Sequence, residues 1–289
     1  MVNLNNRRLV LNNDFDGCLC GYILLNLFEK NKIIGFSNSK DIVWLVDGEK
    51  LDDTVLFIDM FTLEYQSIDQ HIHPMDFEKG FNPNNERHRY TFTDYTRKYP
   101  FSTAFWLLAV AARQGKDISK VIPALKKMSM GDKYYLCDIY LRADDSLLNA
   151  CKYKTNCEDW RKYLVDYSNN NIYLKQLFEF IFSKKEDEVE KWKIKMDNHY
   201  CKEGLNKEEL PDITTEKAKK FFRFFGITYN NITSVIHFER IKTTLKTLDE
   251  FNEFYEENKE HLFSFAFVYG PNKKDVNNFS YSIKIQQQT

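Results

Sequence analysis

The chain has 289 residues and a formal net charge of −1, and 43% of its residues are hydrophobic and 16% aromatic. This composition supports a folded core in one or two domains and excludes an intrinsically disordered chain. The near-zero charge argues against long duplex DNA as the main ligand, because duplexes are held chiefly by a strongly basic surface.

The first half of the sequence alternates between strand and helix patterns. Short apolar runs predict strands at 8–11, 33–36, 42–46 and 55–58. Longer apolar stretches predict helices at 18–29, 101–112 and 118–128. Because this alternation is typical of a mostly parallel sheet flanked by helices, we predict an α/β fold with one domain over residues 1–150.

The sequence changes character after residue 150, where long charged segments with helical periodicity begin. Two strand patterns follow near the end, at 263–269 and 279–285, and Gly270 opens a turn between them. We therefore expect residues 151–289 to form a smaller, mostly helical region that ends in a β-hairpin.

No part of the sequence predicts a signal peptide or a membrane-spanning helix. Residues 1–11 carry two arginines and only a short apolar run, and the longest uncharged stretch, 101–112, is too short to cross a bilayer. The six cysteines are scattered without zinc-finger spacing, so we interpret them as reduced core thiols. These features predict a cytoplasmic protein without a membrane partner.

Acidic side chains and histidines follow three apolar runs of the first domain. Asp14 and Asp16 come directly after the first strand, Asp59 follows 55–58, and Asp69-Gln70-His71 follows a third run. Each motif alone also fits a turn or a strand-end cap. Parallel strands bring their carboxyl ends to one edge of a sheet, however, so we expect the acidic side chains to converge there. Like charges held this close need a cation between them, which predicts a divalent metal site.

Four motifs in this order resemble those of the DHH phosphoesterase superfamily: Asn12-x-Asp14-x-Asp16-Gly17, Asp59, Asp69-Gln70-His71 and Gly131-Asp132. The resemblance covers roughly residues 8–150. It departs from the family pattern at Asn12, where the family usually has histidine, and at Gln70, which replaces the first histidine of the third motif. The family's glycine-rich substrate loop has no Gly-Gly counterpart, so residues 151–289 resemble a truncated substrate-binding domain.

The resemblance implies hydrolysis of a phosphate ester at two divalent ions, Mn²⁺ or alternatively Mg²⁺. Asp59 would bridge the two ions, and a hydroxide held between them would attack phosphorus. The other metal ligands implied are Asp14 for one ion and Asp16, His71 and Asp132 for the other. The acid of the fourth motif could equally be Asp138, Asp144 or Asp145.

Further residues would support this reaction in the same family-based interpretation. Asp69 would orient a metal ligand, and it is counted as catalytic together with Asp14, Asp16, Asp59 and His71. We expect phosphate contacts from the cationic triplet near the motifs and one more histidine, namely Arg87, His88, Arg89 and His73. The implied partner is a small nucleotide: a short single-stranded oligonucleotide, a cyclic dinucleotide or 3′-phosphoadenosine phosphate. A homodimer is compatible with the sequence.

Two other interpretations stay open. Asn12, Gln70 and the missing glycine-rich loop favour a DHH-like domain that binds a nucleotide or a protein without hydrolysis. The segment Asp14-Phe15-Asp16-Gly17 also resembles the first motif of the haloacid dehalogenase superfamily, in which Asp14 would be the nucleophile. The polar residues before Asp14 and the unused Asp69-Gln70-His71 motif count against that phosphatase.

Overall fold

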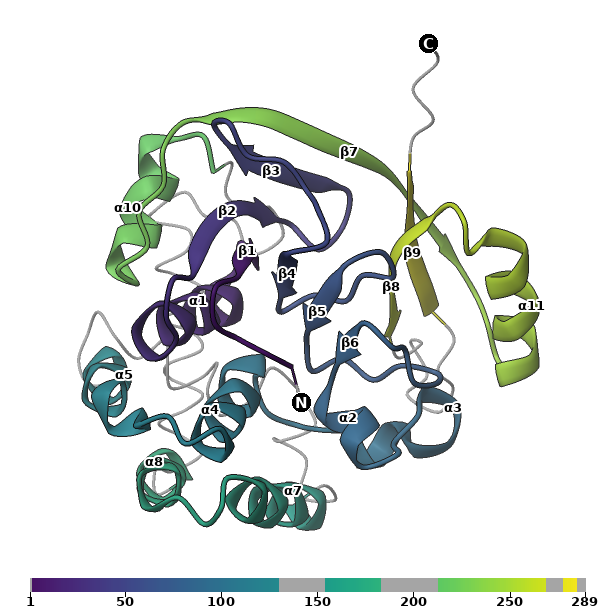
Figure 1. The fold of residues 1–289 in the computed structure, drawn as a ribbon. Coiled ribbons are helices and arrows are strands. Elements are labelled where there is room, and N and C mark those ends of the chain that lie inside the picture. The colour runs from purple at the N-terminus through teal and green to yellow at the C-terminus, as the bar shows by residue number, and fades with distance from the viewer. Residues whose placement is uncertain (1, 130–153, 183–212, 269–277, 285–289) are drawn as a thin grey trace.

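The computed structural model describes residues 2–129, 154–182, 213–268 and 278–284 (Figure 1). The described strands form a single nine-stranded sheet, which curls and is flanked by helices. The α/β class predicted from the sequence is therefore confirmed.

One half of the sheet is parallel. Its strands are β1 (Arg8–Asn12), β2 (Lys32–Ser37), β4 (Val55–Ile58), β5 (Gln66–Ile68) and β6 (Gly80–Phe81). They lie in the order β6-β5-β4-β1-β2, and each neighbouring pair is parallel. β1 and β4 are buried at almost every residue, which explains why both read as continuous apolar runs in the sequence.

The other half of the sheet is antiparallel. Its strands are β3 (Ile42–Val46), β7 (Ile232–Thr243), β8 (Leu262–Val268) and β9 (Asn278–Lys284). They extend the sheet beyond β2 in the order β3-β7-β9-β8. β8 and β9 pair antiparallel, as predicted for the hairpin. The sequence pattern does not predict β7, because most of its side chains are exposed or half-buried and charged residues interrupt its apolar pattern. Its pairing with β3 carries the sheet across residue 150.

Helices cover the sheet on both halves. α1 (Phe15–Leu27) and α4 (Thr103–Arg113) pack together over the parallel strands, and α7 (Lys154–Tyr167) and α8 (Ile172–Phe182) lie outside α4 (Figure 1). α10 (Glu216–Phe224) lies near β2, and α11 (Leu248–Asn258) packs on β8 and β9. The short elements are α2 (Pro83–Glu86), α3 (Thr91–Asp94), η1 (Tyr95–Arg97), η2 (Ile118–Lys120) and α5 (Ile122–Ser129). No helix in these ranges is long and apolar enough to cross a membrane.

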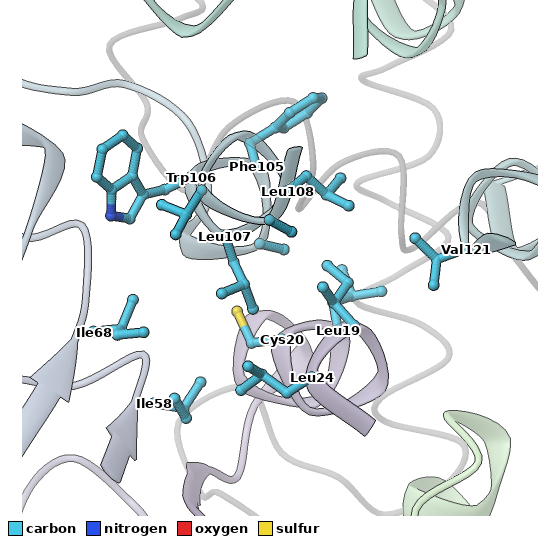
Figure 2. Packing of buried hydrophobic residues seen from close by; sticks show 14 of the residues in the cluster. Leu19, Cys20, Leu24, Ile58, Ile68, Phe105, Trp106, Leu107, Leu108 and Val121 are labelled. Carbon is cyan, nitrogen blue, oxygen red and sulfur yellow. The ribbon is translucent and has the colours of Figure 1, made fainter. Parts of the chain in front are cut away.

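The main core lies between α1, α4 and the parallel strands (Figure 2). Ten of the eleven residues of α4 are buried, so this helix is apolar on every side, as an internal helix must be. Leu107 of α4 points toward Cys20 of α1 in the middle of the core, and Ile58 approaches from the sheet (Figure 2). Each leucine-sized side chain buried in this way contributes about 1.5–3 kcal/mol. This packing fixes the positions of both helices relative to the sheet.

Candidate functional site

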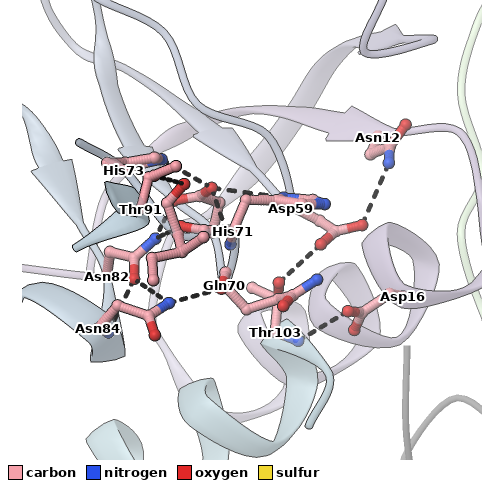
Figure 3. A network of polar contacts seen from close by, with 12 residues as sticks. Asn12, Asp16, Asp59, Gln70, His71, His73, Asn82, Asn84, Thr91 and Thr103 are labelled. Carbon is pink, nitrogen blue, oxygen red and sulfur yellow. Dashed lines mark hydrogen bonds and ion pairs between the residues drawn. The ribbon is translucent and has the colours of Figure 1, made fainter. Parts of the chain in front are cut away.

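Three neighbouring parallel strands end at one edge of the sheet, and a predicted motif follows each of them (Figure 3). Asn12 is the last residue of β1, Asp59 directly follows β4, and Asp69 directly follows β5. Two helices begin at the same edge: Asp14 is the N-cap of α1, and Thr103 is the first residue of α4. The structure therefore brings residues of the first three motifs to one place.

The centre of this site is a pair of carboxylates, Asp14 and Asp59, joined by one amide. Asn12 Nδ2 donates to Asp14 Oδ2 at 2.7 Å and to Asp59 Oδ2 at 3.1 Å. Burial raises the pKa of Asp14 above its ordinary value, and hydrogen bonding to the Gly17 N–H and to Asp59 offsets only part of that rise. Asp14 is half-buried and Asp59 is buried, and ionising two such carboxylates this close together is costly unless a cation lies near them.

Asp59 also has an uncommon backbone conformation. Its φ is +60°, in the left-handed region that residues other than glycine rarely adopt. Such a conformation costs about 1 kcal/mol or more. Asp59 is nevertheless buried, and the Thr103 hydroxyl donates to its Oδ1 at 2.6 Å. Strained backbone conformations cluster at functional sites, which points to a functional reason for a buried carboxylate here.

Asp16 holds the start of α4. Its Oδ2 accepts a hydrogen bond from Thr103 N at 2.7 Å, and its Oδ1 accepts one from Ala104 N at 2.9 Å. A carboxylate is favourable at a helix N-terminus, because the first N–H groups have no partner within the helix and the helix dipole is positive there. The predicted metal ligand Asp16 therefore ties α1 to α4, and both of its oxygens face α4.

Asp69 is a buried carboxylate that lies between two histidines. Its Oδ2 is 3.4 Å from His71 Nδ1 and 3.3 Å from His73 Nε2. Burial alone would raise the pKa of Asp69, but interaction with the nearby rings of His73 and His71 outweighs it and lowers that pKa below its ordinary value. The His71 side chain is 46% exposed, whereas His73 is buried and packs on the ring of Phe61. Asp69 can thus orient His71, while His73 is closed off from a phosphate in solvent.

The ionisation of Asp69 should make the folded protein sensitive to acid. Its folded pKa lies below the ordinary 3.8, so the ionised form contributes stability that is present above that pH and is lost as the pH falls through the folded pKa. At neutral pH we expect Asp69→Asn to lower the free energy of unfolding in urea by about 2 kcal/mol. That difference should shrink below about pH 4, and a constant difference down to about pH 2 would contradict the assignment.

Two buried asparagines hold the segment after β5 in place (Figure 3). Asn82 Nδ2 donates to Asp69 Oδ1 at 2.7 Å. Asn84 Nδ2 donates to the Gln70 carbonyl at 2.8 Å, and Asn84 Oδ1 accepts from the Tyr99 N–H at 2.7 Å. The position of the third motif therefore depends on two side chains that lie outside every predicted motif.

Removing the Asn84 side chain should loosen this segment. Asn84→Ala leaves the Tyr99 N–H and the Gln70 carbonyl buried without these partners, which should cost about 2–3 kcal/mol of unfolding free energy in urea. Asn85→Ala is the matched control, because Asn85 Oδ1 has no hydrogen-bond partner among the described residues, and it should cost under about 0.5 kcal/mol. Equal costs for the two variants would show that Asn84 does not hold the segment.

The three cationic residues predicted to contact phosphate, Arg87, His88 and Arg89, differ from one another in their partners and exposure. Arg87 Nη1 pairs with Asp159 at 2.7 Å, and its guanidinium lies 4.6 Å from the Trp160 ring centroid, so it helps to dock α7. Arg89 is half-buried, 3.6 Å from a carboxylate oxygen of Asp94, and His88 is exposed. The predicted fourth-motif acids lie outside the described residues: Asp132, Asp138, Asp144 and Asp145.

Sequence reasoning did not identify Thr103, Asn82 or Asn84 as residues of the site, and it treated Asn12 only as a departure from a family pattern. Thr103 could have been found, because Ser102 before it is an N-cap residue and marks where free helix N–H groups would lie. Asn82 and Asn84 carry no such signal, because their roles depend on how the chain returns to the edge of the sheet.

The donors at the centre fit a divalent cation. Asp14 and Asp59 offer carboxylate oxygens, and Asp69 holds the His71 ring for coordination through its other nitrogen. Asn12 Oδ1 is a further oxygen, buried and without a hydrogen-bond partner in the described ranges. Across residues 2–129, 154–182, 213–268 and 278–284, no group of three or more His, Cys, Asp or Glu side chains is already arranged to hold an ion.

Comparison with known proteins identifies no relative. No protein-family model matches the chain, and no curated protein or solved structure matches it either.

Proposed function

We propose that the protein is a metal-dependent phosphoesterase that hydrolyses a small nucleotide phosphodiester or phosphomonoester. The observation that carries this proposal is the meeting of Asp14, Asp59 and the Asp69–His71 pair at the carboxyl edge of three parallel strands. Ligands of open α/β sheets bind at this edge. The resemblance of the same residues to DHH motifs supports the same reaction class.

Asp14, Asp59 and His71 would hold the metal ion, with Asp132 as a further proposed ligand. Bound there, Mn²⁺ or Mg²⁺ would lower the pKa of water and offset negative charge on the phosphate. The small net charge of the chain suits a nucleotide or a short single strand better than a duplex.

The chain's own residues prepare this centre. Asp69 engages His71 through Nδ1, which fixes the plane of the ring, and Nε2 is the nitrogen that would coordinate an ion. The Thr103 hydroxyl engages Asp59 Oδ1, so Oδ2 is the oxygen that faces Asn12 and Asp14. Asp16 keeps Thr103 in place by binding its backbone N–H. Each of these contacts removes a rotational freedom that would otherwise be lost on substrate binding.

Hydrolysis of bis-p-nitrophenyl phosphate by metal-stripped protein tests the proposal. We expect activity to appear when Mn²⁺ is added and to fall at least about 100-fold in His71→Ala. His237→Ala is the matched control, because His237 is exposed on β7, and it should keep full activity. Equal activity in the two variants would contradict the role of His71.

A second candidate is a nucleotide-binding protein that does not hydrolyse its ligand. One observation favours it: the Asn12 amide already satisfies both central carboxylates. Tight binding of a mononucleotide with no cleavage in either Mn²⁺ or Mg²⁺ would select this candidate. An aspartyl-phosphate mechanism with Asp14 as the nucleophile is less well supported, because it gives no role to the Asp69–His71 pair at the same edge of the sheet.

A further inference from the structure

The Asn12 side chain lies where a cation between Asp14 and Asp59 would be expected. Its Nδ2 carries two hydrogens, and it donates to Asp14 at 2.7 Å and to Asp59 at 3.1 Å. Figure 3 shows the bond to Asp59. An amide is neutral, so it can bridge two carboxylates but cannot neutralise their charge. The structure thus holds the two acids together with a group that is weaker than a metal ion.

The other end of the same amide is unsatisfied. Asn12 is 6% exposed, and its Oδ1 is buried without a hydrogen-bond partner among the described residues. Leaving a buried carbonyl oxygen unpaired costs about 1–3 kcal/mol. A half-turn of the amide about its last side-chain bond would exchange Oδ1 and Nδ2, because the two ends of an asparagine amide have nearly the same shape.

We propose that Asn12 is a metal ligand that reverses its amide on binding: Nδ2 bridges Asp14 and Asp59 until an ion enters, and Oδ1 then turns to coordinate that ion. This inference rests on the proposed function. Asn12 would give up two hydrogen bonds in this exchange, and its unsatisfied Oδ1 would gain a partner. The same side chain therefore serves both states of the site.

The reversal has a consequence for metal selection. With Asn12 Oδ1 added to Asp14 and Asp59, most donors of this centre are oxygens, and His71 is the single imidazole among them. Oxygen donors suit Mg²⁺, which gives up its water ligands reluctantly. An imidazole ligand instead favours a transition metal such as Mn²⁺ over Mg²⁺. We therefore expect Asn12→His to shift the ratio of Mn²⁺ to Mg²⁺ affinity toward Mn²⁺ by about 10-fold.

Asn12→Asp separates the two roles of the side chain. Aspartate keeps the size and offers oxygen, but it cannot donate to its neighbours, and it adds a third negative charge. We expect the variant to be less stable without metal and to bind Mg²⁺ about 10-fold more tightly in calorimetric titrations. Asn230→Asp is the matched control: Asn230 is exposed in the loop before β7, and the same change of charge should alter neither quantity.

The decisive measurement follows the Asn12 amide itself by NMR, in protein labelled with ¹⁵N at asparagine. The side-chain signals that are missing from Asn12→Asp belong to Asn12, and they should move when Mg²⁺ is added, because both hydrogen bonds to carboxylate are lost. If Mg²⁺ binds while these signals stay unchanged, the reversal is wrong and the proposed metal site stands. If neither Mg²⁺ nor Mn²⁺ binds, the proposed function fails, and the reversal fails with it.

Discussion

Asp59→Asn is expected to abolish metal-dependent hydrolysis and, at the same time, to raise the melting temperature of the metal-free protein. Activity should fall by at least about 100-fold, because the variant removes a charged ligand at the centre of the site. Stability should rise by about 1 kcal/mol, or about 2 °C, because the buried carboxylate of Asp59, next to the half-buried carboxylate of Asp14, loses its charge. Asparagine also tolerates the +60° φ of this position.

A gain of stability with a loss of activity distinguishes a functional carboxylate from a structural one. Asp53→Asn serves as the control, because Asp53 is exposed in the loop before β4 and undergoes the same change of charge. It should change neither activity nor melting temperature. A lower melting temperature for Asp59→Asn with activity retained would identify Asp59 as a structural residue.

Gly17→Ala should destabilise the protein by about 3 kcal/mol or more, although alanine is the better helix former. A Cβ at Gly17 would lie 2.1 Å from the carbonyl oxygen of Asn12, which is backbone and cannot move aside. The gain in helix propensity is about 1 kcal/mol, so the steric clash decides the outcome. The first turn of α1 would have to separate from the end of β1, and this would also displace Asn12 and Asp14.

Urea unfolding measures this effect, and another glycine provides the comparison. At Gly48 an added Cβ meets no atom within 4 Å, so Gly48→Ala bears only the cost of its +74° φ, about 1 kcal/mol. Similar losses for both variants would mean that the close approach of α1 to β1 is relieved at little cost.

The sequence predicts those parts of the fold in which apolar residues follow one another without interruption. β1 and β4 are apolar along their length because both faces are covered, and α4 is apolar all round because it is internal. β7 has no such pattern, because its residues are mostly exposed and its place in the sheet depends on β3 and β9. β3 and β7 are about 190 residues apart in the chain, so their pairing cannot be predicted from local periodicity.

The site follows the same division. The convergence of Asp14, Asp59 and Asp69 is predictable, because parallel strands end at a common edge. The contacts of Asp16 cannot be predicted from the sequence, because a carboxylate two residues from Asp14 is equally suited to bind a metal or to accept from the N–H groups of a helix N-terminus. The structure shows the second arrangement, through the N–H groups of Thr103 and Ala104.

Binding of Mn²⁺, followed by the loss of its free-ion signal in electron paramagnetic resonance, tests the central claim most directly. Metal-stripped wild-type protein should remove Mn²⁺ from solution in a saturable titration, Asp53→Asn should behave in the same way, and Asp59→Asn should lose that binding. Wild-type protein that leaves the Mn²⁺ signal unchanged, or an Asp59→Asn variant that binds as well as the wild type, would contradict a metal centre between Asp14 and Asp59.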